Sequence, residues 1–266
     1  MSAASPVVAL LTDFGLHDHY VGVMKAVILG VCPEATLIDL THDIAPQDVL
    51  GGALALEAAV PFLPDGTVVV AVVDPGVGSG RLAVAVDTGR VRMVGPDNGV
   101  FTLALRQVES FTAVELTESR FHRVQVSRTF EGRDRFAPVA GWLARGVSMG
   151  ALGPPVGGLV LLDVPAPDVD GQAVAGQVLR VDRFGNLITN IDRQCLAGVG
   201  AELEVRVGDL VIPTLSNTYA DVPAGAWCAL VGSTERLEIS INGGHAAARL
   251  GLGRGAAVHV RGRVTT

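Results

Sequence analysis

The apolar segment GTVVVAVVD, residues 66–74, most constrains how this chain folds. Its hydrophobic residues run without alternation, as they do in an interior strand of a parallel sheet that is buried on both faces. Residues 7–13 (VVALLTD) and 35–41 (ATLIDLT) have the same character, and residues 18–30 and 48–63, which follow them, are expected to be helices. This alternation of strands and helices predicts a mostly parallel α/β sandwich.

The character of the sequence changes after residue 150. The next twenty or so residues are rich in Gly and Pro and show no period, which is typical of a linker between domains. From Gln172 onward, short apolar runs separated by turn residues indicate a small β-barrel. We therefore expect an α/β domain at residues 1–150, a linker at 151–171 and a C-terminal β-barrel domain at 172–266.

Charge and cysteine usage narrow the possible classes of function. The formal net charge is −7 and no basic cluster could neutralise phosphates, so nucleic acid is not an expected partner. No apolar run reaches the roughly 18 residues of a membrane span, and the N-terminus lacks the basic segment of a signal peptide. The three cysteines, Cys32, Cys195 and Cys228, are typical of free thiols in a reducing compartment. We expect a cytoplasmic protein without membrane partners.

A glycine-rich loop, residues 72–81 (VVDPGVGSGR), ends the central apolar segment. It lacks the Lys-Ser/Thr pair of a Walker loop, and its glycine spacing does not fit the G-x-G-x-x-G of dinucleotide-binding loops. Two interpretations remain open. The loop is either a tight turn with Asp74 and Arg81 on the surface, or its glycines let the backbone approach a ligand while both side chains face one point.

Two more polar clusters follow predicted strands, at residues 12–20 (TDFGLHDHY) and 41–48 (THDIAPQD). Open α/β sheets bind ligands beyond the carboxyl ends of their strands, so the clusters are expected to converge there. One interpretation is that Asp13 binds a vicinal diol and Asp18 pairs with a cationic group. The alternative is a metal site, although no His-x-x-x-His pair is present. Its candidate ligands are His17, Asp18, His19, His42 and Asp43.

Three downstream segments suit either a ligand or an ordinary turn. Residues 129–138 (TFEGRDRFAP) place acidic side chains at a loop-to-helix junction, where the helix dipole alone would favour them. Residues 181–190 (VDRFGNLITN) set the aromatic Phe184 among amide groups, as an adenine site would, and residues 216–222 (SNTYADV) do the same with Tyr219. A β-turn would explain the last two equally well.

Seven segments together resemble the S-adenosyl-L-methionine (SAM) hydroxide adenosyltransferases, or SAM hydrolases, which are relatives of the SAM-dependent fluorinase and chlorinase. In chain order they are LTDFGLHDHYVGVMKA, DLTHDIAPQDV, VVDPGVGSGR, VGPDNGVFT, RTFEGRDRFAPVA, VDRFGNLITNI and SNTYADV. The resemblance implies an α/β domain followed by a β-barrel, assembled as a homotrimer with SAM between subunits. It also implies hydrolysis of SAM to adenosine and L-methionine by SN2 attack of water or hydroxide at the ribose C5′ carbon. SAM is then the substrate, and neither cofactor nor metal is expected.

The resemblance also assigns roles to individual residues. Asp74 and Arg81 match two members of the family's catalytic Asp-Arg-His set, and the loop lacks the Tyr, Thr and following insertion of the halogenases. Asp13 would bind the ribose hydroxyls, Asp18 and Ser233 the methionine end. The full set of implied substrate-binding residues is Asp13, Asp18, Asp182, Phe184, Asn186, Tyr219, Ser233 and Asn242.

One position departs from the family pattern. The chain reads T-F-E-G-R-D where the family reads T-F-H-G-R-D, so Glu131 takes the place of the third catalytic residue. No histidine aligns with this position, and His122 lies in a different segment. Our hypothesis is that Glu131 accepts a hydrogen bond from water and acts as a partial general base. Two alternatives remain: a SAM- or adenosine-binding protein with little turnover, and a metal-dependent hydrolase that chelators would inhibit.

Overall fold

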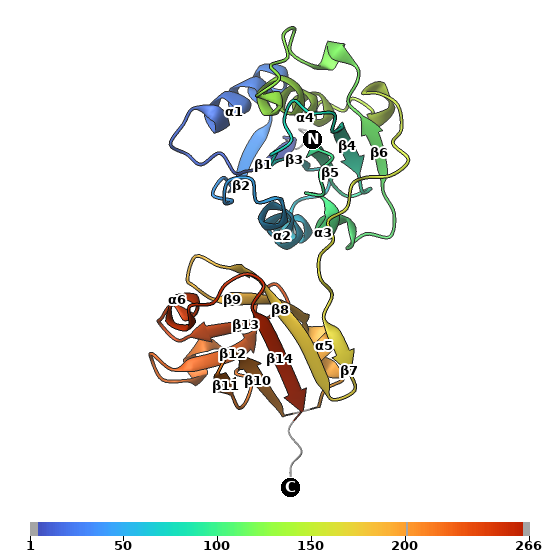
Figure 1. Cartoon of the computed structure of the whole chain (residues 1–266). Helices are drawn as coiled ribbons and strands as arrows, with labels where there is room; N and C mark the ends of the chain where they lie inside the picture. Colours follow the sequence, from blue (N-terminus) through green and yellow to red (C-terminus); the bar gives the residue numbers. More distant parts are fainter. Residues whose placement is uncertain (1–4, 201, 263–266) are drawn as a thin grey trace. The chain divides into compact units, whose positions relative to one another are not determined.

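The computed structural model describes residues 5–200 and 202–262. The chain divides into two compact units, Met1–Asp163 and Val164–Thr266, and each is described by itself (Figure 1). The division falls inside the segment 151–171 that the sequence assigns to the linker. The start of that segment belongs to the first unit, where the Val160 amide donates to Asp97 Oδ1 over 2.8 Å.

The first unit contains a six-stranded sheet in the order β2-β1-β3-β5-β4-β6. Strands β2, β1, β3 and β5 are parallel, and β4 runs antiparallel to β5 and β6. All residues of β3 are buried, as the unbroken apolar segment requires for a strand between two parallel neighbours. The prediction of a mostly parallel α/β unit is confirmed. The strands are β1 (Val7–Thr12), β2 (Thr36–Thr41), β3 (Val68–Val72), β4 (Ala83–Asp87), β5 (Arg92–Pro96) and β6 (Thr112–Glu115).

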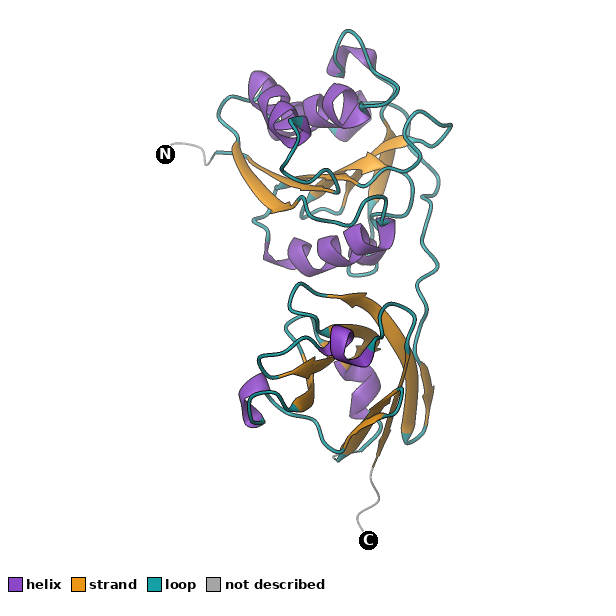
Figure 2. Ribbon diagram, turned by 60° about the vertical axis from the view of Figure 1, so that its left-hand side comes forward, coloured by secondary structure: helices purple, strands orange, loops and turns teal. Residues whose placement is uncertain are grey.

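Helices cover both faces of this sheet (Figure 2). Because side chains alternate along a strand, Leu10 of β1 packs in one core with Met24 and Phe136, whereas Leu11 packs in the other with Leu56. The first core lies under α1 and α4, and the second under α2 and α3. The helices are α1 (Tyr20–Val31), α2 (Val49–Ala59), α3 (Thr102–Leu105) and α4 (Ala137–Ala144), with a π-helical turn at Gly132–Phe136 and 3-10 turns at Val60–Phe62, Ser119–Phe121 and Met149–Ala151.

The second unit is an antiparallel, barrel-like sheet in the order β11-β10-β14-β8-β9-β13-β12, with β7 paired to β8. Its interior is filled by the inward side chains of these strands, for example Val178, Val205 and Ile239. The predicted small β-barrel is confirmed. Its elements are β7 (Asp168–Asp170), β8 (Ala173–Val181), β9 (Leu187–Asp192), α5 (Arg193–Ala197), β10 (Leu203–Val207), β11 (Leu210–Ile212), a 3-10 turn (Tyr219–Asp221), β12 (Trp227–Val231), β13 (Arg236–Ile241), α6 (Ala246–Leu250) and β14 (Ala257–Gly262).

Among the helices built from described residues, none is both long enough and apolar enough to cross a membrane.

Candidate functional site

A cavity of about 400 Å³ opens in the first unit where β1 and β3 end. Three of the carboxylates singled out in the sequence, Asp13, Asp74 and Glu131, line it together. Strands β1 and β3 are neighbours in the sheet, so their carboxyl ends meet at the same edge. The other lining side chains include three aromatic rings in mutual contact, those of Phe14, Tyr20 and Phe130.

Arg81 joins two of these carboxylates without lining the cavity itself. Its Nε donates to Asp74 Oδ1 over 2.9 Å and its Nη2 to Asp74 Oδ2, while Nη2 also lies 2.7 Å from Glu131 Oε2. The side chains of Asp74, Arg81 and Glu131 are only 5%, 10% and 11% exposed. Burial lowers the pKa of Arg81, but the bonds and charges of both carboxylates outweigh it and raise that pKa above its ordinary value.

The glycine-rich loop packs closely enough to make this arrangement possible. Gly78 has φ of +77°, and a Cβ atom there would lie 2.5 Å from the backbone oxygen of Arg128. Only glycine meets both demands. The loop therefore lies against the segment that leads to Glu131, which brings Arg81 within reach of it. Asp74 and Arg81 are thus buried and paired, which excludes the interpretation that places both on the surface, whereas approach of the loop to a ligand stays a prediction.

Glu131 immediately precedes the π-helical turn Gly132–Phe136, a rare conformation that is frequent at functional sites. Asp134 anchors this turn. Its carboxylate is fully buried and accepts from Arg133 Nε over 2.6 Å, from Arg133 Nη2 over 2.7 Å and from the Ser127 amide over 2.8 Å. The turn is thus tied to the preceding loop, which fixes the backbone that carries Glu131.

A second cavity, of about 840 Å³, lies in the second unit. It collects six residues that the sequence assigns to substrate binding, and these are Asp182, Phe184, Asn186, Tyr219, Ser233 and Asn242. Asp182 organises the turn at its edge, because Oδ1 accepts from the amides of Phe184 and Asn186 over 2.9 and 2.8 Å. The segment therefore forms both a turn and part of the cavity wall, and Phe184 is 76% exposed.

Two family models match the chain. The SAM hydroxide adenosyltransferase N-terminal domain matches residues 8–153, and the SAM hydroxide adenosyltransferase C-terminal domain matches residues 176–259. The chain belongs to the SAM hydroxide adenosyltransferase family. The resemblance drawn from the seven segments is thereby confirmed.

Relatives in this family align over nearly the whole chain. The (R)-S-adenosyl-L-methionine hydrolase of Thermus thermophilus is 42% identical over 95% of this chain and 98% of its own. The (R)-S-adenosyl-L-methionine hydrolase of Salinispora arenicola is 40% identical over 92% of this chain and 94% of its own. The fluorinase of Nocardia brasiliensis is 28% identical over 96% of this chain and 97% of its own. An uncharacterized conserved protein from Thermotoga maritima, 34% identical, superposes with a TM-score of 0.91 over 96% of this chain and 100% of that one.

Asp13 and Asp18 do not line the first cavity together. Asp13 lines the first cavity, where its Oδ2 accepts from the Gln47 amide over 2.7 Å. Gln47 has a φ of +66°, a left-handed conformation that is uncommon for residues other than glycine. Asp18 does not line that cavity, and its side chain is 60% exposed and 3.8 Å from His17.

His42, one of the candidate metal ligands, is held in a structural environment. One ring nitrogen of His42 lies 2.9 Å from Thr12 Oγ1 and the other 3.0 Å from Asp39 Oδ1, and the side chain is 2% exposed. Both nitrogens thus bond within the protein. His17, in contrast, is fully exposed. Over residues 5–200 and 202–262 no group of three or more His, Cys, Asp or Glu side chains is arranged to hold a metal ion.

The sequence analysis missed a buried acid in the second cavity. Glu238 of β13 is 6% exposed and accepts a hydrogen bond from the Tyr219 hydroxyl over 2.7 Å. Burial raises the pKa of Glu238, and the bond from Tyr219 offsets only part of that effect. The signal was present in LEISI, where a charged residue interrupts an apolar strand, but a surface-facing residue would give the same pattern.

Glu238→Gln is expected to raise the melting temperature at pH 8 and to leave it unchanged at pH 4. The pKa of Glu238 is raised in the folded state. Its contribution to the free energy of unfolding is therefore fully present at low pH, where the carboxyl is protonated, and is lost as the pH rises through the folded-state pKa. The amide that replaces the carboxyl stays neutral at both pH values and keeps an acceptor for Tyr219. Calorimetric melting should show a gain of about 4–8 °C for each kcal/mol recovered in a unit of this size.

The matched control is Glu202→Gln, which neutralises an exposed glutamate of the same unit. It should change the melting temperature little at either pH. An equal gain in melting temperature for Glu238→Gln at pH 4 and pH 8 would contradict the expectation that the gain comes from removing the charge of Glu238.

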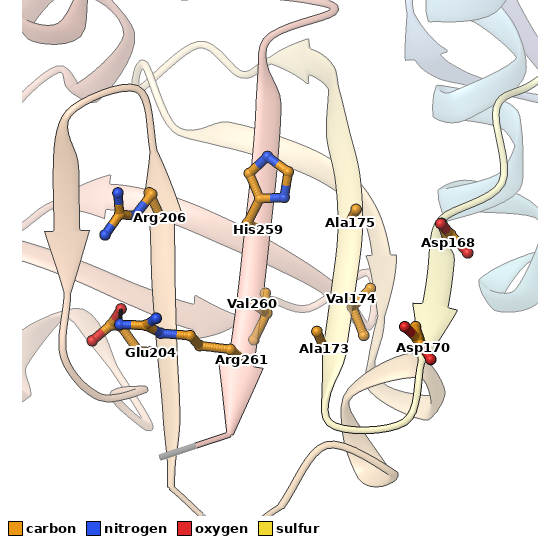
Figure 3. A pocket seen from close by; sticks show the side chains of 10 residues that line it. All are labelled: Asp168, Asp170, Ala173, Val174, Ala175, Glu204, Arg206, His259, Val260 and Arg261. Carbon is orange, nitrogen blue, oxygen red and sulfur yellow. Dashed lines mark ion pairs between the residues drawn. The ribbon is translucent and has the colours of Figure 1, made fainter. Parts of the chain in front are cut away.

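A third cavity, of about 270 Å³, lies over the strands β7, β8, β14 and β10 (Figure 3). Figure 3 shows Asp168 and Asp170 on one side of it and Arg206, His259 and Arg261 on the other. Arg261 Nη2 pairs with Glu204 Oε1 over 2.7 Å. None of the residues assigned to the family's site lines this cavity.

Proposed function

We propose that this chain hydrolyses SAM to adenosine and L-methionine, by SN2 attack of a water molecule on the ribose C5′ carbon. The observation that carries the proposal is the buried set of Asp74, Arg81 and Glu131. Both carboxylates of this set line the first cavity beside Asp13. The hydrolase names of the relatives at 42% and 40% identity support the same reaction.

The charges around the cavity favour water over preformed hydroxide. Generating hydroxide from bulk water at pH 7 costs roughly 12 kcal/mol. Three carboxylates, those of Asp13, Asp74 and Glu131, line the cavity and Arg81 lies against only the last two, so a full negative charge on the nucleophile would be disfavoured. In the proposal Asp74 and Glu131 accept hydrogen bonds from the water and Arg81 holds both carboxylates. The water oxygen bonds to C5′ as the C5′–sulfur bond breaks, and the water passes its proton to Glu131 late in this step. Methionine leaves readily from a sulfonium, so alignment of water and C5′ is the main requirement.

The remaining residues would bind the substrate. Asp13 would accept hydrogen bonds from the ribose hydroxyls, and Phe184 and Asn186 of the second cavity would flank the adenosine. Ser233 and Asp18 would hold the methionine end. We also propose the homotrimer and the cytoplasmic location expected from the sequence, with a neighbouring subunit covering the exposed Asp18.

The test is to incubate the purified protein with SAM, with and without a chelator and with millimolar chloride, and to separate the products by chromatography. Adenosine and methionine in equal amounts, unaffected by chelator, are expected. A chlorinated nucleoside would indicate a halogenase, and loss of activity with chelator would favour the metal-dependent alternative. Unchanged SAM, with binding seen by calorimetry, would favour the second candidate, a SAM- or adenosine-binding protein. This candidate is tested because Glu131 stands where the family pattern in the sequence analysis has a histidine.

A further inference from the structure

The charges of the buried set do not balance by themselves. Asp74 and Glu131 carry two negative charges, and Arg81 carries one positive charge, while each side chain is about nine-tenths buried. An excess charge at such a place is costly unless another group pairs with it. The second carboxylate, Glu131, therefore needs a second cation.

Arg135 meets this need. Its Nη2 lies 3.6 Å from Glu131 Oε1, the carboxylate oxygen that does not face Arg81, and the two residues are four positions apart across the π-helical turn. The Arg135 side chain is 27% exposed, and among the described residues its buried Nε atom has no hydrogen-bond partner. With Arg135 included, two carboxylates face two guanidinium groups.

His122 does not supply the missing charge. Burial and the charge of Arg135 lower its pKa, although the nearby Glu131 acts in the opposite direction. The imidazole is therefore neutral at pH 7. Glu131 has six titratable or charged neighbours among the described residues that line the cavity, pair with it or interact with it electrostatically. They are Asp13, Tyr20, Asp74, Arg81, Arg135 and His122.

We propose that Arg135 is a positioning residue for Glu131. It pairs with Oε1, so that the carboxylate is shared between two guanidinium groups and held in one orientation. Arg135 does not line the cavity, so it acts on the substrate only through Glu131. Its effect on turnover rests on the proposed function, whereas its effect on Glu131 does not.

The first experiment compares Arg135→Met and Arg135→Lys for SAM turnover between pH 5 and pH 9. Arg135→Met should lower kcat about tenfold, less than the 10²–10⁴-fold that a general base contributes, because Glu131 remains but is no longer held by a second guanidinium group. KM for SAM should stay within about twofold, because the cavity wall is unchanged. Arg135→Lys keeps the charge and should restore most of the activity. Arg106→Met, at an exposed position of the same unit, is the matched control and should resemble the natural chain.

A double-mutant cycle separates positioning from general destabilisation. In a Glu131→Gln background no carboxylate remains to be held, so adding Arg135→Met should change kcat by less than about twofold. An equal loss in both backgrounds, or the same loss in Arg106→Met, would overturn the proposal.

A measurement without turnover keeps this inference distinct from the proposed function. Carboxyl ¹³C NMR of glutamate-labelled protein at pH 8, with Glu131 assigned by its absence in Glu131→Gln, should show a changed Glu131 chemical shift in folded Arg135→Met and a smaller change in Arg135→Lys, because the shift reports the surroundings of the carboxylate. This result is expected even if SAM proves not to be turned over. An unchanged Glu131 chemical shift in a variant that melts like the natural chain would overturn the role of Arg135 in either case.

Discussion

Arg81→Lys is expected to lower kcat for SAM hydrolysis by about 10²–10³-fold, the usual cost of removing one preorganised electrostatic group. Arg81 bonds Asp74 through two nitrogens and reaches Glu131 with one of them. A lysine ammonium keeps the charge but cannot reproduce this forked geometry, so the two carboxylates would no longer be held together. Single-turnover kinetics with SAM would measure the chemical step directly.

Binding and a control variant distinguish this effect from simple damage. The Kd for SAM, measured by calorimetry, should change only a few-fold, because Arg81 does not line the cavity. Arg92→Lys is the matched control, since Arg92 pairs with Asp87 over 3.2 Å at a partly exposed position of the same unit. If Arg81→Lys retained kcat within about threefold, the forked arrangement would not matter for the chemistry.

Phe136→Ala is expected to destabilise the first unit by about 3–5 kcal/mol. The ring is fully buried in the core under α1 and α4, and it is among the largest side chains with no exposed surface. It also lies 5.5 Å from the guanidinium carbon of Arg81, so the same residue supports the core and the buried charge set. Urea unfolding, followed by a probe in the first unit, would give the change in unfolding free energy.

Phe62→Ala is the control for this substitution, because Phe62 is 83% exposed. It should alter the unfolding free energy by no more than about 0.5 kcal/mol. A loss below about 1.5 kcal/mol for Phe136→Ala would mean that the core rearranges to fill the space left by the ring, and that the ring contributes less to stability than its burial implies.

The residues of the site illustrate how far sequence patterns reach. The loop 72–81 and the position of Glu131 were identifiable because each motif is contiguous. The family resemblance also named six residues that line the second cavity, and their role in substrate binding stays a prediction. Arg135 was missed although it lies within the segment 129–138, because a residue in a helical turn can face solvent or a partner, and the sequence does not say which. Glu238 was missed for the same reason in a strand.

The sequence by itself determined the two kinds of unit and the chemistry available to the first cavity. Unbroken apolar runs followed by helices specify a parallel sheet, and short alternating runs specify a barrel, because these periodicities are local properties of the chain. Only the tertiary structure decided which charges meet. Arg81 lies between two carboxylates far apart in the sequence, Gly78 lets the loop approach Arg128, and Gln47 adopts a left-handed conformation. Such contacts depend on how segments that are distant in the sequence pack together, and no local sequence pattern specifies how close in space their side chains come.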